Sequence, residues 1–99
     1  MKIKVYPLLS TRTNEPVKNQ FEIRINTRGG TKVFFQSYKS IICKIDNQKI
    51  YLDSYYWDYS RTTMKYLKEF LSDFIGNIST DEIRTKIKTK QIRLTNLNK

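Results

Sequence analysis

The chain has 99 residues with 19 lysines and arginines, nine acids, one cysteine and no histidine, and this length suits one domain around one core. Without histidine or a second cysteine, the usual zinc ligands and the commonest general base are missing, so we expect no enzyme, metal or other cofactor. The formal net charge of +10 favours a polyanionic partner. We therefore expect a protein that binds nucleic acid or a nucleoprotein and takes no small-molecule substrate.

The first half of the chain predicts strands joined by short turns. Apolar and polar side chains alternate most clearly around Phe21 and Ile23. Gly29 and Gly30 supply the positive φ of a hairpin turn, and Asn47 suits a left-handed turn position. The expected strands are residues 2–8, 20–27, 32–38, 40–45 and 49–52, with a polar loop at residues 10–19. Lysines and Pro7 interrupt the opening residues, which predicts neither a secretion signal nor a membrane span and favours a cytoplasmic protein.

Two helices are predicted in the second half. Ser60 is a good N-cap for a helix over residues 61–75, with Tyr59 and Met64 placed as a hydrophobic staple and Gly76 at the end. Ser79 and Glu82 form a capping box for a second, basic helix that runs to about residue 90. Residues 91–97 alternate weakly and predict a short final strand.

The expected fold is therefore a single α+β domain over residues 1–99. It has an antiparallel sheet of four to five strands, one amphipathic helix packed on it and a second, basic helix near the C-terminus. The adjacent Phe34 and Phe35 should divide between the two faces of the sheet, and Cys43 should be a buried thiol.

An aromatic motif, YLDSYYWDYSRTT, spans residues 51–63. In the structural interpretation, Trp57 and Tyr59 seal the corner between sheet and helix. In the functional one, Tyr55 and Tyr56 point in opposite directions, so one ring is exposed beside Arg61 and can stack on a base or serve as an interface hot spot. Two acids of this motif argue against direct phosphate contact and favour a protein surface. Asp58 could instead bond to Arg61 or to free amides at the helix start.

Two basic regions are candidate binding surfaces. Arg24, Arg28 and Lys32 surround the Gly29–Gly30 turn on the expected solvent face of the hairpin, where they could follow a phosphate backbone or merely protect an edge strand. The second region is the basic helix, which could be the recognition helix of a helix-turn-helix with the tail as its wing. Its cations are Arg84, Lys86, Lys88, Lys90 and, beyond the helix, Arg93.

Four stretches together resemble a family of small uncharacterised proteins from phages and plasmids of low-GC Gram-positive bacteria. They are YPL at residues 6–8, PVKNQFE at 16–22, FQSY at 35–38 and, most distinctive, YWDYSRTTMKY at 56–66. The resemblance covers about residues 4–71. It implies a mobile-element accessory protein in the host bacterial cytosol, and such proteins often counter host defences, including CRISPR systems. It implies no active site.

Composition and resemblance together give three hypotheses. The first is an anti-CRISPR-type inhibitor that engages a host RNA-guided nuclease or a similar nucleoprotein through its basic surface and an exposed tyrosine. Because the chain is basic, it cannot mimic DNA, so it would contact guide RNA, compete for target DNA or occupy an acidic patch. The second is a stand-alone DNA- or RNA-binding regulator of the mobile element, and the third is a structural phage component.

Overall fold

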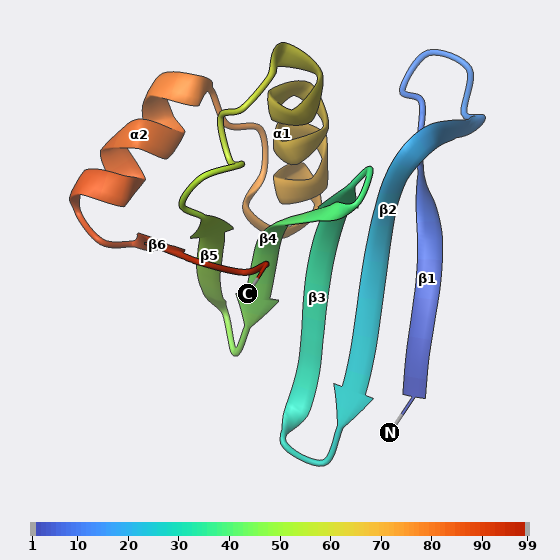
Figure 1. Ribbon diagram of the computed structural model, residues 1–99, viewed down its shortest axis with the longest axis horizontal. Coiled ribbons are helices and arrows are strands. Elements are labelled where there is room, and N and C mark those ends of the chain that lie inside the picture. Colours follow the sequence, from blue (N-terminus) through green and yellow to red (C-terminus); the bar gives the residue numbers. More distant parts are fainter. Residues whose placement is uncertain (1, 99) are drawn as a thin grey trace.

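The computed structural model describes residues 2–98 and shows one six-stranded sheet with two helices (Figure 1). The elements in chain order are β1 (Lys2–Leu9), β2 (Pro16–Thr27), β3 (Gly30–Ser37), β4 (Ser40–Asp46), β5 (Lys49–Asp53), α1 (Arg61–Ile75), α2 (Thr80–Lys88) and β6 (Ile92–Thr95). The strands lie in the order of the sequence, β1-β2-β3-β4-β5-β6. The α+β class is therefore confirmed.

The sheet differs from the prediction in size and direction. β1 to β5 form an antiparallel meander, but β6 pairs with β5 in parallel, with Ile50 opposite Ile92 and Leu52 opposite Leu94. The predicted antiparallel sheet of four to five strands is thus correct for β1 to β5 but wrong in strand number and in the direction of β6. A parallel neighbour needs a long crossover connection, and the two helices supply it between β5 and β6. The tail is consequently a strand of the main sheet and not a wing.

The turns follow the local signals in the sequence, except that only Gly30 of the two hairpin glycines has a positive φ, at 127°. The β2–β3 hairpin turns at Arg28 and Gly29, with Thr27 opposite Gly30. In the β4–β5 turn, Asn47 takes a left-handed conformation with φ 51°, as predicted.

Both helices begin at the predicted caps. The Ser60 side chain accepts a hydrogen bond from the Thr63 backbone N–H at 3.0 Å. Ser79 and Glu82 make the reciprocal capping box, with both bonds at 3.1 Å. Gly76 ends α1 with a positive φ of 79°, which glycine adopts without strain.

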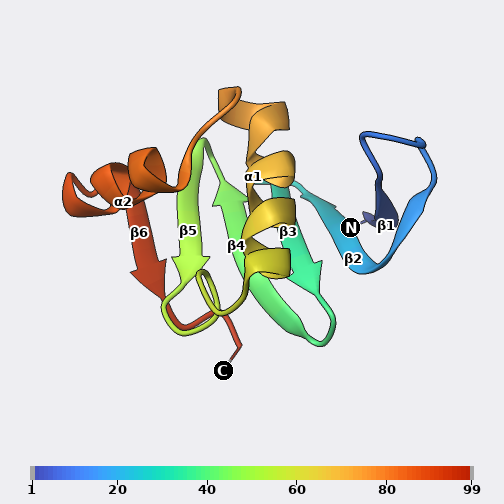
Figure 2. The same ribbon diagram turned by 90° about the horizontal axis from the view of Figure 1, so that it is seen from above.

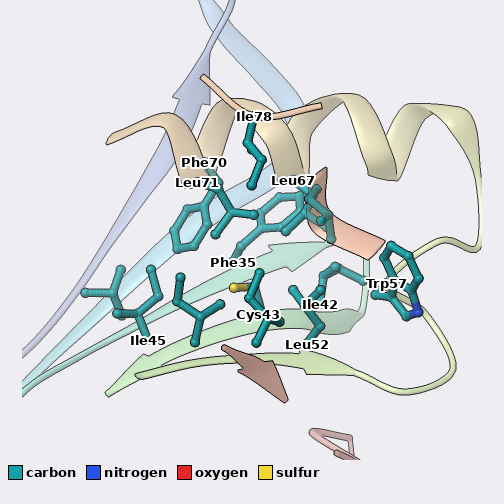
Figure 3. Packing of buried hydrophobic residues seen from close by; sticks show 14 residues of the cluster. Phe35, Ile42, Cys43, Ile45, Leu52, Trp57, Leu67, Phe70, Leu71 and Ile78 are labelled. Carbon is teal, nitrogen blue, oxygen red and sulfur yellow. The ribbon is translucent and has the colours of Figure 1, made fainter. Parts of the chain in front are cut away.

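The core lies between α1 and strands β3 to β5 (Figure 3). Phe35 is fully buried and stacks on Phe70 of α1 with ring centroids 5.6 Å apart. Phe34, its neighbour, is half-buried on the opposite face of the sheet, so the predicted division of the two rings is confirmed. Cys43 is buried as expected, and its burial raises the pKa of the thiol, which keeps it protonated and unreactive.

The helices cover only part of one sheet face. In Figures 1 and 2, α1 lies over the middle strands and α2 beside β6, while β1 and β2 reach past both helices. We call the opposite face the helix-free face. Phe21, Ile23 and Ile25 of β2 lie on it and are half-buried.

The face that β2 turns toward the helices is polar. Glu22 and Gln20 are buried there, because the register places Glu22 opposite Phe35, which lies under α1. The alternation in β2 predicted which of its side chains share a face. Which of the two faces the helix covers depends instead on β3, because Phe35 packs against α1.

Candidate functional site

The aromatic motif is organised around Asp53, a buried carboxylate at the end of β5 with 2% of its surface exposed. Its Oδ2 accepts the backbone N–H groups of Tyr55 and Tyr56 at 3.1 and 2.9 Å. Its Oδ1 accepts the Leu97 N–H at 2.8 Å, which ties the loop to the chain beyond β6. Asp53 therefore anchors the loop between β5 and α1, a role that the sequence analysis did not predict.

Two opposing effects act on the pKa of Asp53. Burial of the carboxylate raises the pKa, but hydrogen bonds from three backbone amides and from the Asn98 side chain favour the charged form and lower it below its ordinary value. Asp53 thus carries a buried negative charge that the loop amides stabilise. Because its side chain is buried, it is not placed to contact a phosphate at the loop surface directly.

The loop places three tyrosine rings together on its outer side. Tyr55 and Tyr59 are 67% and 66% exposed, and Tyr56 is half-buried against the core. The centroid of the Tyr55 ring lies 4.7 Å from that of Tyr56 and 6.0 Å from that of Tyr59, and the rings of Tyr56 and Tyr59 are 5.7 Å apart. We call Tyr55, Tyr56 and Tyr59 the tyrosine cluster.

These positions confirm one aromatic prediction and correct another. Trp57 is buried at the sheet-to-helix corner, as the structural interpretation required. Tyr59 is 66% exposed and not buried with it, so it does not seal the corner. The N–H of Tyr59 donates to the carbonyl of Tyr56 at 3.2 Å, and this tight turn directs the Tyr59 ring outward beside Tyr55.

A basic groove lies between α1 and α2 next to the tyrosine cluster. It has a volume of about 340 Å³. We use the name basic groove for its four cations, Arg61, Lys65, Lys68 and Arg84. Asp58 is the one acid in its lining, and the first turn of α1 contains no acidic residue. The free amides of that turn therefore add to the positive potential.

The tyrosine cluster and the basic groove form one continuous surface. A second hollow, of about 230 Å³, lies between the β3–β4 turn and the loop that joins β5 to α1. Tyr38, Tyr56 and Tyr59 line it. Ser60 lines both this hollow and the basic groove. The N-terminus of α1 is thus the shared wall between exposed aromatic rings and clustered cations.

The cations of α2 and β6 do not form a single surface. Arg84 faces α1 across the basic groove, whereas Lys86 donates a hydrogen bond to Gln91 at 3.1 Å. Lys90 and Arg93 line a separate hollow beside β6. Lys88 follows Arg84 by one helical turn, so it lies on the same side of α2. The structure therefore connects only part of the predicted basic helix with the aromatic motif.

The three hairpin cations are also separated. Arg24 lies on the helix-covered side, where it contacts Glu22 at 2.6 Å and lies 6.0 Å from the centre of the Phe74 ring. Lys32 is on the helix-free face beside Asp46, and Arg28 is exposed at the turn. A common solvent face for all three was therefore a wrong expectation, because paired strands put Arg24 opposite Val33 and not opposite Lys32.

The surface formed by the tyrosine cluster, the basic groove and the hollow beside them contains four residues that the sequence-based candidates did not include. They are Tyr38, Tyr59, Lys65 and Lys68. One signal could have found the lysines. Arg61, Lys65 and Lys68 are spaced by four and three residues, which places them on one side of a helix. Tyr38 carried no comparable signal, because it joins the surface only through the fold of the β3–β4 turn.

Residues 2–98 contain no group of three or more histidine, cysteine, aspartate or glutamate side chains placed to hold a metal ion. Over the same residues, neither helix is long and apolar enough to cross a membrane.

The fold and the surface define a small α+β domain with exposed aromatic and basic side chains grouped at one helix start. The chain belongs to a family of unknown function, DUF8033, whose model matches residues 2–91. No curated protein and no solved structure matches the chain. The family match covers the tyrosine cluster and the basic groove.

Proposed function

We propose that the protein binds single-stranded nucleic acid through the tyrosine cluster and the basic groove, and that it acts by binding and not by catalysis. The observation that carries this proposal is the shared wall at Ser60, which joins two exposed tyrosine rings to four cations. Single-strand binding needs both features, because the bases stack on aromatic rings while cations follow the phosphates.

The arrangement suits a single strand better than a duplex. In a duplex, the base faces are stacked inside the helix and cannot reach Tyr55 and Tyr59. A recognition helix would need its cations on one side, but in α2 Arg84 lines the basic groove whereas Lys86 donates a hydrogen bond to Gln91 on another side. Unpaired bases can lie on the tyrosine cluster while the adjoining phosphates enter the basic groove.

Salt dependence gives the first test. If each of the four cations of the basic groove meets one phosphate, the logarithm of the association constant should fall with the logarithm of salt concentration at a slope of about −3. Removal of two cations in Arg61→Gln/Lys65→Gln should reduce this slope to roughly half. The readout is fluorescence anisotropy of labelled oligothymidine, oligouridine and a random duplex at several salt concentrations.

A matched control carries the same loss of charge elsewhere. Arg28 and Lys49 lie at the turns on the other end of the sheet from the tyrosine loop (Figure 1). The variant Arg28→Gln/Lys49→Gln should keep the slope of the unmodified protein. If the salt slope fell equally in the two double variants, binding would depend only on the net charge of the protein. That result would refute the basic groove as the binding site.

The tyrosines give the second test. Because both rings are about two-thirds exposed, Tyr55→Ala/Tyr59→Ala should leave the fold intact. Loss of stacking should weaken binding to the single strands roughly fivefold or more. Tyr6→Ala, at an exposed tyrosine of β1, is the control and should have no effect. Unchanged affinity of the double tyrosine variant would remove stacking from the proposal.

A second candidate is the inhibitor of a host RNA-guided nuclease, in the mobile-element setting that the sequence resemblance implies. The exposed pair Tyr55 and Tyr59 favours it, since clustered tyrosines often dominate protein interfaces. A guide-loaded nuclease therefore belongs in the same binding panel. Tight, weakly salt-dependent binding to the nuclease, with little affinity for free single strands, would favour the inhibitor over the single-strand binder.

A further inference from the structure

The free edge of β1 is a second surface, on the side of the sheet remote from α2 (Figure 1). β1 pairs only with β2, and its register is regular from Lys2 to Pro7. Ile3 and Val5 are 57% and 58% exposed on the helix-free face. An edge strand of this kind presents unpaired backbone groups next to unburied apolar side chains.

Pro7 reveals which backbone groups of β1 are unpaired. It is paired with Phe21 but has no N–H, so this pair must be one of the non-hydrogen-bonded pairs of the antiparallel ladder. Such pairs alternate with hydrogen-bonded ones, so Val5 and Ile3 are non-hydrogen-bonded toward β2 as well. Their N–H and C=O groups therefore point away from the sheet.

The side chains of β1 alternate in chemistry as well as in direction. Ile3 and Val5 lie on the helix-free face, whereas Lys2 and Lys4 lie on the other side. Neither lysine has an acidic partner within 4.0 Å among residues 2–98. An added strand would thus meet apolar neighbours on one face and unpaired cations on the other.

We propose that the free edge of β1 binds an extended peptide segment of a partner protein in which apolar and acidic residues alternate. The segment would add a seventh strand by hydrogen bonding to the backbone of Ile3 and Val5. Its apolar side chains would bury those two residues, and an acidic side chain would lie directly opposite Lys4, where cross-strand pairs are closest.

The lysines disfavour a second copy of the chain as the occupant. Antiparallel registers that use Ile3 and Val5 without Pro7 place Lys4 opposite Lys4 of the other copy, or Lys2 opposite Lys4. Like charges in these positions are destabilising. The next register places Pro7 opposite Ile3, where proline supplies no N–H for the ladder. Charge therefore selects an acidic segment over self-pairing.

The test is a nuclear magnetic resonance titration with two short synthetic peptides, one of alternating valine and glutamate and one of alternating valine and lysine. The glutamate peptide should shift the amide signals of Ile3 and Val5, and the lysine peptide should not. The variant Lys4→Glu should reverse this preference and weaken the glutamate peptide at least about threefold. Lys49→Glu, with the same change of charge on another strand, should bind like the unmodified protein.

A backbone variant gives an independent test. Val5→Pro removes an outward N–H without removing a hydrogen bond to β2, so it should abolish peptide binding in a folded protein. The Lys4→Glu exchange decides the matter if the proline variant does not fold. Equal binding of both peptides, no shifts at β1, or loss of the Ile3 and Val5 signals on self-association would each overturn the proposal. Arg61→Gln should leave peptide binding unchanged, which separates this edge from the basic groove.

Discussion

Asp53→Asn should destabilise the protein by about 2–4 kcal/mol at neutral pH. The two Asp53 oxygens accept three backbone N–H groups between 2.8 and 3.1 Å, but asparagine has only one acceptor oxygen. Either orientation of the amide turns its NH₂ group toward at least one of these donors. Hydrogen bonds to a charged group contribute roughly 1.5–3 kcal/mol each, and an unpaired buried donor adds a further cost. The loss is a large part of a typical total stability of about 5–15 kcal/mol.

Urea unfolding followed by tryptophan fluorescence measures this loss. Trp57 is the sole tryptophan and is buried beside the loop, and its backbone N–H donates to the backbone carbonyl of Asp53 at 3.1 Å. Asp58→Asn is the matched control, because Asp58 is exposed in the same loop. Its effect should stay within about 0.5 kcal/mol.

The pH dependence of this stability loss tests whether the charge of Asp53 is its cause. The pKa of Asp53 is lower in the folded protein than in the unfolded chain, where it is about 3.9. The charge of Asp53 therefore stabilises the folded protein at every pH above the unfolded pKa, and this stabilisation disappears as the pH falls through the folded pKa. The difference between the unmodified protein and Asp53→Asn should be full above about pH 4 and shrink below it. A loss under about 1 kcal/mol at pH 7, or one that persists unchanged in acid, would refute the role of the charge.

Two further stability predictions follow from the caps and the core. Ser60→Ala should cost about 1 kcal/mol in urea unfolding, because the Thr63 amide loses its cap; no measurable loss would show that the cap is dispensable. The Cys43 thiol, buried and with a raised pKa, should react with a thiol reagent only as fast as the domain opens and at once in denaturant. Reaction of the native protein at the rate of a free thiol would contradict this burial.

Local signals in the sequence were sufficient to predict most of the helices, strands and turns. The Ser60 cap, the Ser79 capping box and the turn at Asn47 each depend on residues close in sequence, and all three are confirmed. The direction of β6 could not be predicted, because pairing with β5 depends on how two helices pack between them. Which face of β2 is covered depended in the same way on Phe35 in the next strand.

The candidate site was predictable only in part. Exposure of one ring from the Tyr55–Tyr56 pair and burial of Trp57 are confirmed. The expected extended segment was wrong, however, because residues 54–58 form turns and the rings of Tyr55 and Tyr56 do not point in opposite directions but lie with centroids 4.7 Å apart. Exposure of Tyr59 depended on the turn that Asp53 anchors, and a buried carboxylate with only backbone partners has no sequence signature. That Arg61 and Arg84 line the same groove is a tertiary feature that sequence spacing cannot predict.

The most direct measurement of the proposed single-strand surface is a residue-resolved nuclear magnetic resonance footprint of oligothymidine on the protein. We predict that the amide shifts centre on residues 55–68 and on Arg84, with the tyrosine cluster and the basic groove affected together. Shifts centred instead on the hairpin turn at Arg28, or on Lys86 and Lys90, would contradict the account.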